Sequence, residues 1–315
     1  MERIAVICKG SEWSLLPLCQ SLGRKGYQIY CFYQSGERYS IHSKYISGKT
    51  KIPSVLKISN LEQIKFLCYK LSIKKLICLS DEIKYLISQN RNHFSNLDMA
   101  LPSVFNFEKA FFKDQTMLVA KSCGVPIPKT FFVESSENLP VLDFGKDKLF
   151  VVKGISGSGS ERVAYAKNQE QLITEYAKIY DIEEKDEFCK APPFIQQYVG
   201  GPTYLSQAIV NNGEVLAVIP HKKKREIPVT GGITTRASTI ESQRITKYMK
   251  IILEKLNWHG EVGMEWKYDE HRKDYVLLEI NPRFEGSLDI AIKSEVDLPK
   301  LLIKLLEKNI ENKWH

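Results

Sequence analysis

Polar side chains stand at alternate positions in the segment YVLLEINPRFEGS, residues 275–287, although its apolar run is typical of a buried strand. In a β-strand Glu279 and Asn281 point to the same side, and Arg283 follows them. Glu265 lies on the preceding hairpin strand, where it can pair with Glu279 across the turn. Because carboxylate and amide oxygens suit Mg²⁺ and a guanidinium suits phosphate, the spacing predicts a magnesium–phosphate site. The alternative, a surface hairpin with exposed polar residues, explains the apolar run poorly.

A second candidate is the loop in VVKGISGSGSERV, residues 151–163, which begins where a strand ends at Lys153. Glycines let backbone N–H groups approach an anion closely, serine hydroxyls add donors, and the lysine supplies positive charge. The loop therefore suits a polyphosphate, although it has neither Walker A nor G-x-G-x-x-G spacing. A flexible hairpin loop without a ligand is the alternative that remains open.

A third candidate is the basic run HKKKRE, residues 221–226, in a chain with a formal net charge of +8. His221, Arg225 and Arg236 could hold a substrate carboxylate or a phosphoryl group, and residues 230–232 could form an anion-contacting turn. A solvated basic surface explains the lysines equally well. Nucleic acid is not an expected partner, because aromatic residues are not interleaved with the basic ones.

Composition bounds the class of protein. The chain has 315 residues, of which 43% are hydrophobic and 26% charged, as in globular enzymes. No apolar stretch approaches the length of a membrane span, and the N-terminus lacks the features of a signal peptide. The seven cysteines form no C-x-x-C pair and mostly lie in apolar runs. These features predict reduced core thiols and a cytoplasmic protein without a membrane partner.

The first hundred residues alternate strand and helix signals, which predicts a doubly wound parallel sheet with helices on its faces. The expected strands are residues 3–10, 27–33 and 74–80, and the expected helices are residues 14–26 and 60–72. Ligands bind beyond the carboxyl ends of such strands, where residues 9–11 and 80–82 stand. Asp81 and Glu82 could equally be first-turn acids that stabilise the next helix.

The remaining elements are predicted in mixed order. Helices are expected at residues 107–124, 168–180, 239–257 and 298–311. Strands are expected at residues 130–133, 148–154 and 192–199, in a hairpin at 203–220 and in a second hairpin at 259–283.

With these motifs together, LLEINPRFEGS, the upstream GMEW, the VVKGISGSGS loop and the GVPIPKT segment, the chain resembles the ATP-grasp superfamily. The likeness is greatest to the carbamoyl-phosphate-synthase-like, single-chain carboxylate–amine ligases, and D-aspartate ligase and pyrrolysine-pathway ligases are similar in plan. It implies an ATP-grasp fold preceded by an N-terminal doubly wound (pre-ATP-grasp) domain. The implied divisions are 1–108, a central small subdomain with its linker helix at 109–194, and a C-terminal subdomain with the metal site at 195–315.

The resemblance also implies roles for individual residues. Lys113 and Lys153 match the nucleotide-binding lysines, and Arg283 matches the arginine at the γ-phosphate. Glu265, Glu279 and Asn281 match the ligands of Mg²⁺ or Mn²⁺. The flap over the triphosphate and the adenine-reading hinge are matched by Ser156, Gly157, Ser158, Gly159 and Ser160 and by Gln196, Gln197, Tyr198 and Val199.

The sequence departs from the family pattern at the nucleotide. Gly154 stands where a proline is common, Gln196 and Thr203 stand where glutamates are common, and an acidic residue is common near Gln207. The adenine and ribose contacts therefore follow less directly from the resemblance than the metal site does.

The implied activity is an ATP-dependent ligase that joins a small carboxylate and an amine through an acyl phosphate, with Arg236 and Arg283 as catalytic residues. One alternative is a carbamoyl-phosphate-synthase-like subunit that phosphorylates bicarbonate or carbamate, and another is a catalytically silent ATP-binding regulator. A homodimer is compatible with the resemblance. The acid and the amine are not encoded by any local motif.

Overall fold

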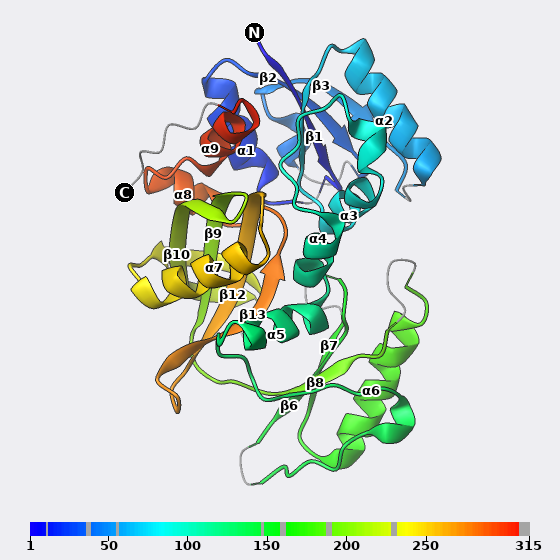
Figure 1. Ribbon diagram of the computed structural model, residues 1–315, viewed down its shortest axis with the longest axis vertical. Coiled ribbons are helices and arrows are strands. Elements are labelled where there is room, and N and C mark those ends of the chain that lie inside the picture. The colour runs from blue at the N-terminus through cyan, green and yellow to red at the C-terminus, as the bar shows by residue number, and fades with distance from the viewer. Residues whose placement is uncertain are drawn as a thin grey trace.

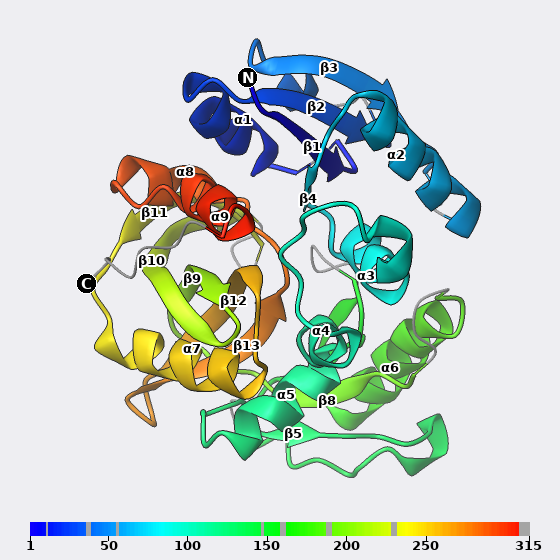
Figure 2. The ribbon, with the colours of Figure 1, turned by 45° about the horizontal axis from the view of Figure 1, so that its top comes forward.

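The computed structural model describes residues 1–10, 12–35, 39–54, 57–145, 148–157, 162–186, 191–227 and 232–308. Within these ranges the strands form three sheets, of four, four and five strands. Figure 1 shows them in three lobes, with the N-terminal sheet at the top, the large sheet below it and the small sheet at the lower right. Figure 2 shows three helices, α3 (Asp81–Gln89), α4 (Val104–Phe111) and α5 (Lys113–Ser122), between the lobes.

The N-terminal sheet is parallel, as the sequence predicted, and its strands lie in the order β3-β2-β1-β4. Its strands are β1 (Arg3–Cys8), β2 (Gln28–Tyr33), β3 (Ile46–Lys51) and β4 (Lys75–Cys78). Ile4 and Val6 pack with helix α1 (Leu15–Arg24), whereas Ala5 and Ile7 pack with α2 (Ile58–Lys70). Because neighbouring residues of β1 enter different cores, the sheet is covered on both faces.

The small sheet is antiparallel, in the order β5-β8-β6-β7, and α6 (Gln169–Glu183) covers it. Its strands are β5 (Thr130–Phe131), β6 (Phe150–Lys153), β7 (Val163–Ala166) and β8 (Phe194–Gln197). Asn168 caps α6 by accepting the Gln171 N–H at 2.8 Å. This cap fixes the first residue of α6, which begins shortly after β7 ends.

The large sheet has the order β11-β10-β9-β12-β13 and is antiparallel throughout. Its strands are β9 (Thr203–Asn211), β10 (Glu214–Ile227), β11 (Ile233–Thr239), β12 (Gly260–Asp269) and β13 (Asp274–Asn281). Helix α7 (Gln243–Lys255) packs on one face through a shared core. The helices α8 (Leu288–Lys293) and α9 (Leu298–Leu306) instead share a core with α1, which joins the C-terminal end to the N-terminal lobe.

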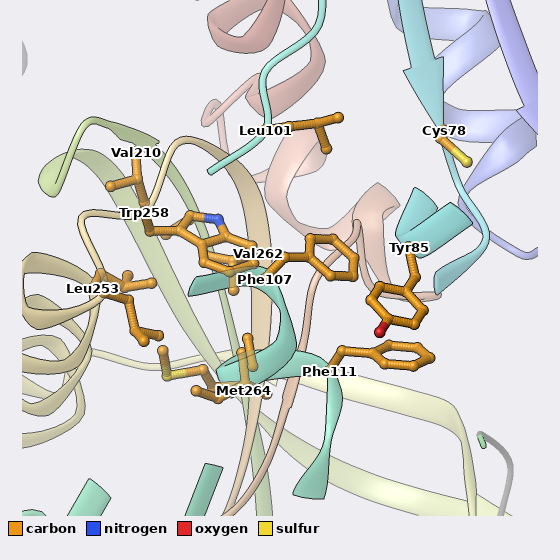
Figure 3. Close-up of a cluster of buried hydrophobic side chains, with 14 of the residues drawn as sticks. Cys78, Tyr85, Leu101, Phe107, Phe111, Val210, Leu253, Trp258, Val262 and Met264 are labelled. Carbon is orange, nitrogen blue, oxygen red and sulfur yellow. The ribbon is translucent and has the colours of Figure 1, made fainter. Parts of the chain in front are cut away.

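One aromatic cluster connects the large sheet to the N-terminal lobe (Figure 3). Phe107 stacks on Trp258 at a ring-centroid distance of 6.1 Å, and Phe111 stacks on Tyr85 at 4.9 Å. Tyr85 belongs to α3 (Asp81–Gln89), so the cluster runs without a break from the sheet through α4 to α3. Buried aromatic surface of this kind resists relative movement of the lobes.

The helix predicted at residues 107–124 is wrong as a single element. The structure has α4 (Val104–Phe111) and α5 (Lys113–Ser122), separated at Phe112, whose φ of −87° and ψ of 121° are extended. Phe112 packs beside Ile155 of the small lobe, and the Lys113 N–H donates to the Ile155 carbonyl at 2.9 Å. These tertiary contacts outweigh helix propensity and place Lys113 at the start of α5.

The strands β3 and β11 and the helix α8 were not predicted. Strand β3 alternates half-buried and exposed residues at a sheet edge, and it contains a glycine, so its strand signal is weak. The division of the chain near residues 108 and 194 stays a prediction.

Two findings concern the class of protein. In the part of the chain that the structure describes, no helix combines the length and apolar character that crossing a membrane requires. Cys8, Cys19, Cys31, Cys68 and Cys78 are buried free thiols and Cys123 is a half-buried one, as predicted for core thiols.

An ion pair buried between lobes yields a test of stability. Lys84 of α3 donates to Glu261 of β12 at 2.5 Å and to the Pro282 carbonyl at 2.8 Å, and both charged residues are buried. We expect Lys84→Met to lower the free energy of unfolding by about 3–5 kcal/mol, because it leaves a buried carboxylate without its cation. Urea unfolding measures the change.

The control is Lys178→Met, which removes an exposed partner of Glu175 on α6. It should change the unfolding free energy by less than about 1 kcal/mol. Equal effects of the two substitutions would contradict a stabilising role for the buried pair.

Candidate functional site

The site begins with a β-bulge in the β12–β13 hairpin. Glu265 pairs directly with Glu279, as predicted, but the register shifts at the next residue, so that Trp266 pairs with Leu277. Trp266 and Leu277 lie in the core beneath α7, whereas Glu265 and Glu279 belong to the opposite face. The extra residue in β13 shifts by one position which side chains point to each face of the sheet. The strand can therefore point apolar side chains into the core in its first half and polar side chains to the opposite face at its end.

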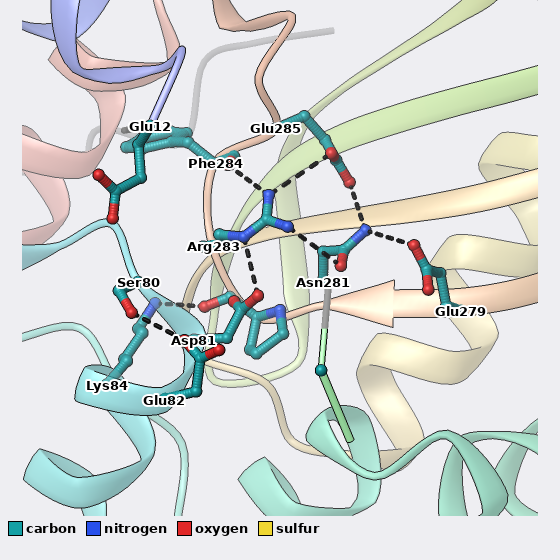
Figure 4. Close-up of polar contacts among 12 residues, drawn as sticks. Glu12, Ser80, Asp81, Glu82, Lys84, Glu279, Asn281, Arg283, Phe284 and Glu285 are labelled. Atoms are coloured by element: carbon teal, nitrogen blue, oxygen red, sulfur yellow. Dashed lines mark hydrogen bonds and ion pairs between the residues drawn. The ribbon is translucent and has the colours of Figure 1, made fainter. Parts of the chain in front are cut away.

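Asn281 ties two carboxylates together beyond the hairpin pair (Figure 4). Its amide nitrogen donates to Glu279 Oε1 at 3.3 Å and to Glu285 Oε1 at 2.8 Å. Gly263 lies opposite Asn281 on β12, and a Cβ there would stand 2.2 Å from Glu285 Oε1. Only glycine leaves room for the Glu285 carboxylate, a residue of the site that no signal in the sequence selects.

Arg283 is held by side chains from two lobes. Its Nε donates to Asp81 Oδ2 at 2.8 Å, and its Nη2 lies 3.5 Å from Asn281 Oδ1. Nη1 donates to the Phe284 carbonyl at 3.2 Å and lies 3.7 Å from Glu285. Burial opposes the charge of Arg283, but Asp81 and Glu285 outweigh it and raise the pKa of the guanidinium. Asp81 therefore does more than begin α3.

Glu82, next to Asp81, turns to other partners. It accepts from the Ser80 hydroxyl at 2.9 Å and pairs with Lys9 at 2.9 Å. The ends of β1 and β4 are thus connected to each other, and Asp81 connects β4 to Arg283. This edge is the carboxyl end of the parallel sheet, where the sequence predicted a ligand site.

Two lysines approach the carboxylates from the central part of the chain. Lys113 donates to the Gly157 carbonyl at 2.6 Å. Burial lowers the pKa of Lys153 to about 8, and the positive charge of Lys113 acts in the same direction. Burial also works against ionisation of Glu279, but Lys113 and Lys153 overcome it and hold the pKa of that carboxyl below its ordinary value. The opposite charges of Glu279 and the two lysines stabilise one another.

Lys223 of β10 is a residue of the site that the sequence did not single out. Its ammonium lies 3.1 Å from Glu265 Oε2, and its side chain is only 6% exposed. Burial raises the pKa of Glu265 to about 7, with Glu279 and Glu285 adding to the effect of burial and Lys223 opposing it. Within a run of lysines, sequence alone gives no means of telling the inward one from its neighbours.

The described base of the glycine–serine loop is anchored to α6. Ser156 donates to Asp186 at 3.1 Å and accepts from Arg162 at 2.8 Å, while Arg162 also pairs with Glu183 at 3.1 Å. A Cβ at Gly154 would stand 2.2 Å from Glu183 Oε1, which explains why proline is absent there. The Ser156 hydroxyl is thus engaged within the protein. Ser158, Gly159 and Ser160 lie outside the described residues.

The predicted hinge continues from β8. Gln196 is buried, and its amide nitrogen contacts Met117 Sδ at 3.1 Å and Thr130 Oγ1 at 3.0 Å. Its carbonyl oxygen is buried without a hydrogen-bond partner among the described residues. The backbone N–H groups of Gln197 and Tyr198 donate to the carbonyls of Lys129 and Leu149, which directly precede β5 and β6, and Val199 follows β8.

The candidate residues of the basic hairpin β10–β11 lie in different surroundings. Arg236 is exposed on the edge strand β11, opposite Arg225. His221 is fully buried, and its Nε2 is hydrogen-bonded to the Ser287 hydroxyl at 2.7 Å, so this nitrogen is engaged within the protein. Thr230 and Gly231 lie outside the described residues. The structure therefore brings Arg283, and not Arg236, into contact with the Glu279–Asn281 pair.

The donor set fits a hard cation only in part. Among the described residues no group of three or more His, Cys, Asp or Glu side chains could hold a metal ion. Glu265, Glu279 and Asn281 offer two carboxylates and an amide on adjacent strands. Such a small set suits a cation that takes its remaining ligands from phosphate and water.

Comparisons with known proteins agree with this picture. Residues 191–315 match the model of a family described as ATP-grasp in the biosynthetic pathway with Ter operon. No curated protein matches the sequence.

Several solved structures share the fold along the whole chain. L-amino acid ligase from Bacillus licheniformis superposes with a TM-score of 0.75 at 14% identity, over 100% of this chain and 77% of that one. Biotin carboxylase from Campylobacter jejuni superposes with a TM-score of 0.72 at 15% identity, over 97% of this chain and 71% of that one. N5-carboxyaminoimidazole synthetase from Staphylococcus aureus superposes with a TM-score of 0.70 at 13% identity, over 96% of this chain and 77% of that one. The predicted fold class is confirmed, because the chain shares the fold of these structures over nearly its whole length, and residues 191–315 in addition match an ATP-grasp family model.

Proposed function

We propose that the protein is an ATP-dependent carboxylate–amine ligase that works through an acyl phosphate and releases ADP and phosphate. One observation carries the proposal: Lys113 and Lys153 act electrostatically on Glu279, which pairs with Glu265 and is linked through Asn281 to Arg283. Cations and metal-binding acids placed together in this way suit a triphosphate with its metal. A protein that only bound nucleotide would not need the full charge set.

The nucleotide would lie between the small and large sheets. Lys113 and Lys153 would neutralise its phosphates. The hinge residues Gln196, Gln197, Tyr198 and Val199 would contact the adenine edge through backbone groups other than the N–H groups of Gln197 and Tyr198, which already donate within the protein. Two of the similar proteins support a nucleotide here, because the Campylobacter biotin carboxylase was solved as a β,γ-ATP complex and the Staphylococcus synthetase as an ADP complex. Glu265, Glu279 and Asn281 would hold Mg²⁺ or Mn²⁺, which when bound supplies positive charge to the phosphate oxygens.

In the first chemical step the substrate carboxylate attacks the γ-phosphorus, and the bond to the ADP oxygen breaks. Lys113, Lys153 and Arg283 lower the barrier by holding the oxygens whose charge shifts during transfer. The amine nitrogen then attacks the acyl carbon, phosphate leaves, and the nitrogen loses a proton to give the amide. Asp81 would keep the guanidinium in place for both steps, because it fixes Nε while Nη2 lies beside the proposed metal ligand Asn281.

A second candidate is phosphorylation of bicarbonate or carbamate. A similar structure, the biotin carboxylase domain dimer from Hydrogenobacter thermophilus, was solved in complex with MgADP and bicarbonate. That protein is 13% identical to this chain, so it supports the fold rather than the substrate. Because it is a dimer, a homodimer also stays a proposal for this protein. We propose small-molecule acid and amine substrates, held partly by the N-terminal lobe (residues 1–108).

The first prediction from the proposed function tests the reaction class. With ATP and Mg²⁺, the protein should release phosphate only when both a carboxylate and an amine from a panel of each are present, because the acyl phosphate turns over only when an amine consumes it. Coupled phosphate detection measures this, and mass spectrometry identifies the amide. Release with bicarbonate alone would support the second candidate. Tight ATP binding without release under any condition would contradict both.

The second prediction tests the metal ligands. Glu279→Ala should lower kcat by at least about 100-fold, since it removes a donor that positions the cation at the phosphates. Circular dichroism and the urea midpoint should stay close to those of the unaltered protein, because Glu279 lies on the polar face. Unchanged turnover in a folded variant would refute the assignment of Glu279.

The third prediction tests the support of Arg283. Asp81→Asn keeps the shape but removes the charge that orients Nε, so kcat should fall by roughly 10–100-fold while KM for ATP changes little. Glu82→Gln is the matched control from the same helical turn, since Glu82 pairs with Lys9 instead. Its kcat should stay within about twofold. Equal losses in the two variants would argue for a general effect of charge at this edge.

A further inference from the structure

The position of Lys223 raises a question that the proposed reaction leaves open. Its ammonium lies 3.1 Å from Glu265, one of the carboxylates assigned to the metal, and 3.5 Å from Glu226. It also donates to the Gly232 carbonyl at 3.2 Å. A metal cation that binds Glu265 must therefore compete with the ammonium of Lys223, which already contacts this carboxylate.

Lys223 is the inward member of the lysine run. Its neighbour Lys222 lies over the ring of Tyr204 at 5.6 Å, and Lys224 is exposed. Among the described residues, the ion pair made by Glu265 is the one with Lys223. Since Glu265 faces Glu279 directly across the hairpin, this ammonium offsets the repulsion between two buried carboxylates.

Glu226 provides a second place for the same ammonium. Its Oε2 is buried and has no hydrogen-bond partner among the described residues, although it stands within ion-pair distance of Lys223. A small rotation of the lysine side chain could therefore exchange Glu265 for Glu226 without leaving the charge unpaired. Lys223 thus has two carboxylates within ion-pair distance, and only Glu265 is one of the proposed metal ligands.

We propose that Lys223 stands in for the divalent cation in the nucleotide-free protein, by neutralising Glu265, and moves away from this carboxylate when the cation binds. The proposal rests on the proposed function, because it takes Glu265 and Glu279 as metal ligands. It implies that the cation enters together with the nucleotide. The ammonium then pairs with Glu226 or with the incoming phosphates, and the vacated Glu265 carboxylate accepts the metal.

The test uses the whole protein without nucleotide and Mn²⁺ as the probe, detected by electron paramagnetic resonance. Lys223→Met should bind Mn²⁺ about tenfold more tightly than the unaltered protein, because the competing charge is gone. Without the cation its thermal midpoint should fall by about 3–6 °C, and saturating Mn²⁺ should restore it. The unaltered protein should gain little from Mn²⁺ alone.

Two kinds of control isolate the effect. Lys222→Met and Lys224→Met remove the same charge from adjacent positions and should leave Mn²⁺ affinity within about twofold. In the double variant Lys223→Met/Glu265→Gln, the midpoint should recover without the cation and the gain in Mn²⁺ affinity should vanish. This recovery would assign the instability to the unbalanced pair of carboxylates rather than to lost packing of the lysine stem.

Unchanged or weaker Mn²⁺ binding by Lys223→Met, with an unchanged midpoint, would overturn the inference while leaving the metal site standing. A different result bears on the proposed function. If Mn²⁺ binding in the presence of ATP is the same in the unaltered protein and in Glu279→Ala, the metal assignment itself fails.

Discussion

Two carboxylates, Glu265 and Glu279, face each other across the β12–β13 hairpin, and positive charges nearby offset their repulsion. The positive charges come from different parts of the chain: Lys113 and Lys153 from the central part and Lys223 from the neighbouring strand β10. Each lies where it does because of a separate local device, such as the helix break at Phe112 or the end of β6. The charge balance therefore holds together elements far apart in sequence.

The N-terminal lobe also contributes a charge to this site, the carboxylate of Asp81. Arg283 follows the metal-binding strand, yet its closest partner, Asp81, is 202 positions away at the end of a parallel strand. The aromatic cluster around Phe107 and Tyr85 and the buried Lys84–Glu261 pair hold that lobe against the large sheet. A rigid interface of this kind explains how one charged contact between lobes can stay short.

Much of this arrangement could be predicted because it depends on local pattern. The parallel order of the first lobe, the two hairpins and the pairing of Glu265 with Glu279 follow from alternation and turn signals. What could not be predicted depends on tertiary contacts. The break at Phe112 arises from packing on Ile155, Glu285 depends on space left by Gly263, and Lys223 is distinguished from its neighbours only by the course of β10. The residue roles stay predictions.

The bulge in β13 makes the hairpin sensitive to length as well as to identity. Because one extra residue separates the core-facing half of the strand from the polar half, the two halves are out of phase by a single position. A substitution within the bulge would leave that phase intact. Loss of one residue there would turn the carboxylates toward the core or the apolar side chains toward the charged site. In the evolution of such a protein, selection should therefore act more strongly against insertions and deletions in this segment than against substitutions.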